Sequence, residues 1–170
     1  SFSDVERPIV AQLFTADPSM MEGAAKLCAE LGFDGVDINM GCPDKSIEKQ
    51  GSGAGMIKTP EIAVEIIAAA KRGIASAGKD IPVSVKTRVG YHVPTINEWI
   101  GLLLKQNISA LTVHARTRKD LSKVPAKWEL LKEVVALRDQ IAPETVIVGN
   151  GDVISMADGL EKAKFSGVDG

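Results

Sequence analysis

Short apolar segments rich in β-branched residues alternate along this chain with longer segments of helical periodicity. The apolar segments predict strands at residues 8–13, 34–39, 81–86, 109–115 and 144–149. An apolar position every three or four residues predicts helices at about residues 18–31, 60–77, 95–106, 126–139 and 155–165. Strands that alternate with helices in this way form parallel sheets. The pattern predicts five βα units, arranged either as an open doubly wound sheet or as part of a (β/α)8 barrel.

Each predicted strand also carries a polar residue near its carboxyl end, on the face opposite its aliphatic side chains. Alternation places Val36 and Ile38 on one face of their strand, for example, and Asp37 and Asn39 on the other. The polar residues are Gln12, Asn39, Lys86, His114 and Asn150. A lysine in a buried parallel strand is costly unless something pairs with it, so we interpret the set as a ligand site. A ring from consecutive strands fits the carboxyl-end active site of a barrel better than the crevice of an open sheet.

Composition and charge narrow the class of protein. The chain has 170 residues, 45% of them hydrophobic, which predicts one globular domain over residues 1–170. Its net charge of −2 provides no general basic field, so a nucleic-acid partner would need a local patch. No apolar run reaches the roughly 18 residues of a membrane span, and no leader pattern precedes the first strand. We therefore expect no membrane partner and a cytoplasmic location.

The two cysteines have different contexts. Cys28 lies among alanine and leucine in a helical segment, which predicts a small buried side chain. Cys42 lies between Gly41 and Pro43, in a loop just past a strand that projects over the polar ring. They form no CxxC pair, so we expect neither a disulfide nor a metal site. A thiol in that loop is either a nucleophile or a general acid, and the lack of an obvious histidine partner favours the acid.

Cations and glycines cluster at the same strand ends. Lys86 and Arg88 suit an anionic or electron-rich ligand, such as a phosphate or a flavin. The basic stretch Arg116–Lys119, with Lys123 and Lys127, either contacts a polyanionic backbone or is a solvated loop. Asn150, Gly151 and Asp152 form either a turn that approaches a ligand closely or an ordinary βα turn.

The glycines of residues 51–55 do not form a dinucleotide fingerprint. Such a fingerprint leaves a strand directly and opens a helix, whereas these glycines begin about a dozen residues after the strand. We expect them to be a flexible segment that closes the loop carrying Cys42, able to order over a substrate.

Four motifs together resemble the catalytic domain of the tRNA-dihydrouridine synthases, which are FMN-dependent (β/α)8 barrel enzymes. The motifs are INMGCPDKSIEKQGSGAGMI, SVKTRVGY, LTVHARTR and VGNGD, with AQLF upstream. The first is specific to that family, and the others are shared more loosely with other FMN barrels. The resemblance covers nearly the whole chain.

The resemblance implies reduction of uridine to 5,6-dihydrouridine in tRNA, with FMN as cofactor and NADPH as its reductant. Cys42 matches the general acid that protonates C5 while reduced flavin delivers hydride to C6. Residues matching those that contact FMN are Gln12, Lys86, His114, Asn150, Gly151 and Asp152. Asn39 and Arg116 match positions that face the substrate.

The resemblance also implies that residues 1–170 form a single partial FMN-binding barrel domain, because a complete barrel has about 250 residues. We expect the first two barrel strands, the eighth strand and the helical tRNA-binding C-terminal domain of the family to be absent. Open barrel edges would then allow self-association. Two alternatives are another FMN-barrel oxidoreductase acting on a small molecule, similar to dihydroorotate dehydrogenase, and a non-catalytic half-barrel.

Overall fold

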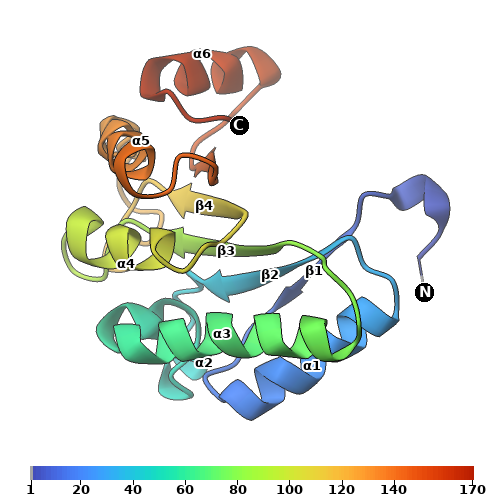
Figure 1. Cartoon of the computed structure of the whole chain (residues 1–170). Coiled ribbons are helices and arrows are strands. Elements are labelled where there is room, and N and C mark those ends of the chain that lie inside the picture. Colours follow the sequence, from blue (N-terminus) through green and yellow to red (C-terminus); the bar gives the residue numbers. More distant parts are fainter. Residues whose placement is uncertain (1) are drawn as a thin grey trace.

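The computed structural model describes residues 2–170 and contains one five-stranded parallel sheet (Figure 1). The strands are β1 (Val10–Leu13), β2 (Gly35–Met40), β3 (Val83–Arg88), β4 (Ala110–His114) and β5 (Val146–Asn150). They lie side by side in chain order, β1-β2-β3-β4-β5, and every neighbouring pair is parallel. A doubly wound sheet reverses its strand order at a switch point, and this sheet does not. The α/β fold is therefore of the (β/α)8-barrel type, with five βα units, as predicted.

Helices connect the strands of the sheet. They are α1 (Pro18–Glu30), α2 (Lys45–Lys49), α3 (Pro60–Ser76), α4 (Gly101–Leu104), α5 (Glu129–Ile141) and α6 (Met156–Ser166). Shorter turns are the 3₁₀ segments η1 (Asp4–Glu6) and η2 (Gly53–Lys58) and the π segment η3 (Ile96–Ile100). Helices α1, α3, α4, α5 and α6 pack against one another in that order, whereas α2 packs against the short segment η2. Four of the five predicted helices match α1, α3, α5 and α6, and the fifth is divided between η3 and α4. The two short elements α2 and η2 were not predicted.

Local sequence explains where the helices begin and end. Asp17 precedes Pro18 at the start of α1, and its carboxylate accepts hydrogen bonds from the N–H groups of Ser19 and Met20. The Ser155 hydroxyl accepts a hydrogen bond from the Asp158 N–H in the same way at α6, and Gly167 ends that helix in the left-handed conformation.

The core lies between the aliphatic face of the sheet and the helices. Val36, Ile38, Val85, Leu111 and Val113 alternate along the three central strands and are fully buried. Cys28 of α1 is 8% exposed and belongs to this core, as predicted. The opposite face carries the polar side chains of β2 and β3 and, on the two edge strands, the apolar side chains of Val10 and Val146 as well.

The two edge strands of the sheet carry exposed apolar side chains. Val10 on β1 and Val146 on β5 are both exposed. Residues 168–170 run beside β5, where the Gly149 N–H donates to the Gly170 carbonyl (2.8 Å).

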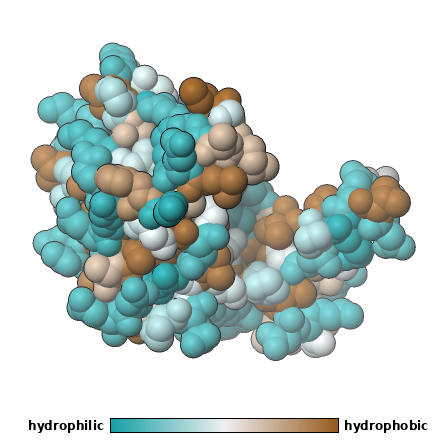
Figure 2. Space-filling model, turned by 90° about the horizontal axis from the view of Figure 1, so that it is seen from above, coloured by the Kyte–Doolittle hydropathy of each residue, from teal (hydrophilic) through white to brown (hydrophobic). Residues whose placement is uncertain are grey.

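Helix α6 is uppermost in Figure 1, and Figure 2 shows that face from above, with hydrophobic side chains interrupting a mostly hydrophilic surface. Within residues 2–170, no helix has both the length and the apolar character to cross a membrane.

Candidate active site

The predicted polar residues meet at the carboxyl end of the sheet, on three successive levels. Strand register fixes these levels because residues paired across parallel strands lie at the same height. From the lowest level upward, the paired residues are Gln12, Asp37 and Ser84; then Asn39 and Lys86; then Arg88, His114 and Asn150. The ring is therefore staggered, as expected for strands that tilt around a barrel.

A hydrogen-bond network joins the lower levels. The carboxylate of Asp37 accepts from the Ser84 hydroxyl and from the Gln12 amide, both at 2.7 Å. The Gln12 side-chain oxygen in turn accepts from the Asn39 amide nitrogen at 3.1 Å. Since the Asn39 nitrogen is committed to Gln12, its oxygen points to the other side, toward the loop after β2.

That oxygen binds the loop that carries Cys42. Asn39 Oδ1 accepts hydrogen bonds from the N–H groups of Gly41 (3.1 Å) and Cys42 (3.0 Å). The Cys42 carbonyl accepts from the Ala54 N–H at 2.9 Å, and the cysteine is free and partly exposed. The sheet network therefore fixes the backbone from which the thiol extends.

The glycine-rich segment that follows is packed, which corrects the expectation of a flexible segment. Residues 53–58 form η2, and its first four residues are buried. Gly53 has φ of 59°, and a Cβ there would lie 2.7 Å from the Cys42 carbonyl oxygen. The glycines allow a left-handed turn and a close approach to the Cys42 loop, so their role is packing.

Lys86 is the cation of the middle level. Its Nζ donates to Asn150 Oδ1 at 3.2 Å, which brings two predicted cofactor-binding residues together. Burial lowers the pKa of Lys86, and the positive charge of Arg88 lowers it further, against the opposing effects of Asp37 and Cys42. A desolvated ammonium group of this kind favours an anionic or electron-rich partner.

His114 is neutral at pH 7. Burial, followed by the charges of Arg88, Lys86 and Arg116, lowers its pKa to about 4. Its Nε2 lies 3.1 Å from Arg116 Nη1. Because arginine only donates, Nε2 must accept, so the single proton of the neutral ring is on Nδ1.

Arg116 and Asp152 pair with each other. Arg116 is 6% exposed, and its Nη2 lies 2.7 Å from both carboxylate oxygens of Asp152. Asp152 also accepts from the Ala126 N–H at 2.8 Å. That backbone bond and the Arg116 side chain lower the pKa of Asp152. Gly151, with φ of 125°, packs closely on the His114 ring, where a Cβ would lie 3.1 Å from Cδ2.

Comparison with known proteins decides the family. The family described as "Dihydrouridine synthase (Dus)" matches residues 1–170. The chain belongs to the Dus family. This confirms the resemblance carried by the NMGCP, SVKTR, HARTR and VGNGD motifs.

Named relatives of this Dus chain come from several bacteria. It is 43% identical to "Probable tRNA-dihydrouridine synthase" of Staphylococcus epidermidis RP62A and 42% identical to that of Staphylococcus aureus COL. It is 45% identical to "Probable tRNA-dihydrouridine synthase 2" of Bacillus subtilis 168. Each match covers all of this chain and 50 or 51% of the relative. The chain therefore spans about half the length of the curated relatives it matches.

Two sets of contacts at the candidate site were not predicted from the sequence. Strand alternation places Asp37 and Ser84 inward, but nothing in the sequence shows that they orient Gln12 and Asn39. In the basic stretch, Arg118 is paired with Glu48, which lies 70 positions away in the chain. No local pattern predicts that pairing. The exposed cations of this loop are Lys119, Lys123 and Lys127.

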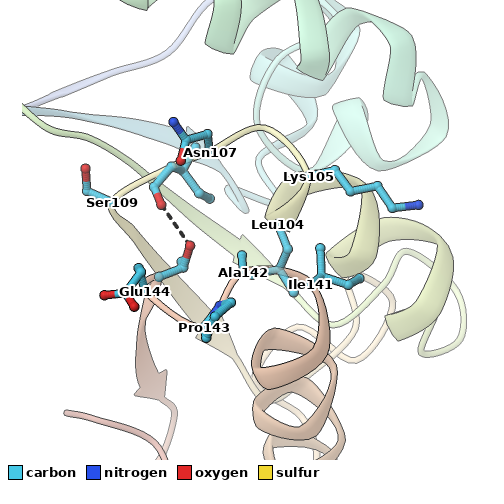
Figure 3. Close-up of a pocket in the computed structure, with 10 residues that line it drawn as sticks. Leu104, Lys105, Asn107, Ser109, Ile141, Ala142, Pro143 and Glu144 are labelled. Carbon is cyan, nitrogen blue, oxygen red and sulfur yellow. Dashed lines mark hydrogen bonds between the residues drawn. The ribbon is translucent and has the colours of Figure 1, made fainter.

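A hollow of about 620 Å³ lies at the opposite end of the sheet (Figure 3). It is formed by the connections that precede β4 and β5, where the Thr145 hydroxyl donates to the Ile108 carbonyl at 2.9 Å. In barrels this end of the strands serves stability, and the chemistry lies at the carboxyl end. We therefore place the candidate site at the polar ring. Within residues 2–170, His, Cys, Asp and Glu residues form no group suited to hold a metal ion.

Proposed function

We propose that this chain supplies the catalytic face of an enzyme that reduces uridine in tRNA to 5,6-dihydrouridine, using FMN and NADPH. The observation that carries the proposal is the convergence of the Lys86–Asn150 pair and neutral His114 at the strand ends beside the loop of Cys42. Membership in the Dus family and the names of its relatives support the same activity.

The donor set suits a flavin. Lys86 would face the N1–C2=O region, where negative charge develops on reduction, and Asn150 would orient the lysine. His114 would donate from Nδ1, because Nε2 is engaged by Arg116. Gln12 would lie at the rim of the flavin site. Gly151 and Asp152, in the turn after β5, would approach the ribityl phosphate. FMN held there and reduced by NADPH would supply hydride chemistry at C6 of the uracil.

Cys42 would act as the general acid. Its thiol would hold the proton that C5 of the uracil takes up, and would be left as a thiolate. Lys86 and Arg88 lie near enough to Cys42 to interact with it electrostatically, so their positive charges would stabilise that thiolate. His114, being neutral, adds no competing acid of comparable strength at pH 7.

A uracil within folded tRNA must leave its stack to reach such a site. Asn39 and Arg116 are the proposed substrate contacts. Asn39 would act on the substrate through the Cys42 loop that it holds. Arg116 contacts Val124, His114 and Asp152 through Nε, Nη1 and Nη2, and would offer the substrate the second N–H of Nη1. Exposed lysines beside the site would attract the phosphate backbone.

The test is an assay with FMN, NADPH and a tRNA transcript that carries no modifications. We expect protein that retains flavin after gel filtration, and dihydrouridine in the nucleosides released from the tRNA, measured by mass spectrometry. The matched control replaces the tRNA with a small enone or orotate. If flavin is bound and reduced by NADPH but only the small molecule turns over, the tRNA assignment is wrong.

A further inference from the structure

Arginine side chains bind the carbonyl groups on both sides of Cys42. Arg88 Nε donates to the Gly41 carbonyl at 2.8 Å, and Arg118 Nη2 donates to the Pro43 carbonyl at 3.3 Å. Arg88 comes from β3 and Arg118 from the loop after β4, so two different parts of the fold hold the short segment that carries the thiol.

Arg118 is itself held by Glu48. Its Nε lies 2.8 Å and 3.0 Å from the two carboxylate oxygens of Glu48, and Nη2 also contacts the carboxylate. Glu48 lies on α2, the helix that begins directly after the Cys42–Pro43 turn. The side chains are 19% and 9% exposed, so the pair is largely shielded from water. Arg118 therefore contacts the Cys42 loop at two points, a carbonyl before α2 and a carboxylate on it.

The backbone of Arg118 is fixed to the loop that follows β3. The Arg118 N–H donates to the Gly90 carbonyl (2.9 Å), and the Lys119 N–H donates to the Tyr91 carbonyl (2.8 Å). The guanidinium of Arg118 also lies over the Tyr91 ring, 5.6 Å from its centroid, with Lys58 Nζ at 4.6 Å. The backbone around Arg118 is thus anchored beyond β3, and the ion pair ties the Cys42 loop to that anchor.

We propose that Arg118, paired with Glu48, is a positioning residue that holds the Cys42 loop over the carboxyl end of the sheet. The polyanion contact considered for the basic stretch does not suit this side chain, because its donors are directed into the protein. The importance of this pair for catalysis rests on the proposed role of Cys42, but its effect on the position of the loop does not. The effect on the loop can therefore be tested without measuring turnover.

The experiment measures alkylation of the thiols by iodoacetamide in the folded 170-residue chain, with each site quantified by peptide mass spectrometry. The alkylation rate is measured over a range of pH, so that the rate constant reached when the thiol is fully ionised can be compared between variants. Arg118→Gln and Glu48→Gln should each raise the limiting rate at Cys42 roughly five- to tenfold, as expected when one partner of a partly buried pair is removed and the loop opens locally. Cys28 is buried, so it should stay protected in every variant.

Three controls decide the interpretation. Lys119→Gln removes the same charge from the exposed neighbour and should leave the rate at Cys42 unchanged. The double variant Glu48→Gln/Arg118→Gln should react no faster than either single variant, because both break one connection. Arg118→Lys keeps a cation beside Glu48 and should recover part of the protection.

Several results overturn the proposal. They are an unchanged rate in Arg118→Gln, an equal rise in Lys119→Gln, or multiplicative effects in the double variant. Equal acceleration at Cys28 and Cys42 also overturns it, because it indicates unfolding of the whole domain. Since no outcome depends on flavin or tRNA, this inference and the proposed function can fail independently.

Discussion

The side-chain oxygen of Asn39 lies 3.0 Å from the backbone nitrogen of Cys42 and 3.1 Å from that of Gly41. One side chain near the end of β2 therefore occupies two N–H donors of the loop that begins there. Short polar side chains often bind backbone donors two or three positions ahead in this way. Because Asn39 is itself oriented by Gln12 and Asp37, the position of the thiol is linked to the polar network inside the sheet.

Asn39→Ala should weaken the fold and the activity together. Removing the oxygen leaves two N–H groups without their acceptor, which costs about 1 to 2 kcal/mol at a partly exposed site. Displacement of the thiol should lower dihydrouridine formation roughly tenfold or more. Urea unfolding and the tRNA assay measure these effects. Asn97→Ala, at an exposed position on η3, is the matched control and should change neither. Equal behaviour of the two variants would contradict the linkage.

Gly53→Ala should destabilise the protein much more than Gly78→Ala. Both glycines have positive φ, 59° and 67°, so both alanines have the left-handed penalty of about 1 to 2 kcal/mol. The Cβ at position 53 would also lie 2.7 Å from the Cys42 carbonyl oxygen, whereas position 78 has no atom within 4 Å. The clash should add about 1 to 3 kcal/mol to the loss for Gly53→Ala. Similar free energies of unfolding in urea would show that η2 is not packed against this loop.

Most of the architecture was accessible from the sequence. All five strands follow from the period-two aliphatic positions, because parallel strands are buried and must be apolar on the helix side. The βα spacing left the strand order open between a doubly wound sheet and a barrel, and the polar residues at the strand ends favoured the barrel order that the sheet has. The bounds of α4 were harder to predict, because the residues before it, Ile96–Ile100, form a π-helical segment. The short helix α2 was missed, although Asp44 accepts from the Ser46 and Ile47 N–H groups as a typical N-cap.

The sequence predicted which polar side chains face inward better than it predicted what they contact. Alternation indicates that Asn39, Lys86 and His114 face inward, but not that Arg116 binds Asp152 or that Arg118 binds Glu48. Such pairs join segments that are distant in the chain, and their geometry depends on how those segments pack. Residues 51–55 show the same limit: glycine permits both flexibility and close approach, and only the three-dimensional neighbours decide between them.

His114 should make stability depend on pH below neutrality. Its folded pKa of about 4 lies below the unfolded value of about 6.5, so between these pH values the unfolded chain binds more protons. The free energy of unfolding should therefore rise from about pH 4 to about pH 6.5, by about 1 to 2 kcal/mol after allowance for solvent screening. Above that window the ring is neutral in both the folded and the unfolded chain, so its titration no longer changes the free energy of unfolding.

The pKa of His114 can be followed by NMR, because the chain has only two histidines and His92→Gln assigns them. Lys86→Gln removes one of the charges that lower the pKa and should move it up toward 6.5. Lys79→Gln, an exposed position before β3, should leave it unchanged. A titration of His114 near 6.5 in the parent chain would remove the assignment of a neutral, Nδ1-protonated ring.

Lys86→Gln should also weaken flavin binding. The substitution keeps a hydrogen-bond donor near Asn150 but removes the charge proposed to face the flavin, so the Kd for FMN should rise roughly tenfold or more. Quenching of FMN fluorescence on titration with protein measures the change, with Lys79→Gln as the control. An unchanged Kd would place the flavin elsewhere than over Lys86.

Cys42→Ala provides the most direct measurement of the proposed chemistry. The substitution removes the thiol proton but leaves the backbone contacts of residue 42 with Asn39 and Ala54. The variant should bind FMN and accept electrons from NADPH at the parent rate, while dihydrouridine formation in tRNA falls by at least about a hundredfold, as expected for loss of a general acid. Retention of near-parental dihydrouridine formation would show that Cys42 is not the acid.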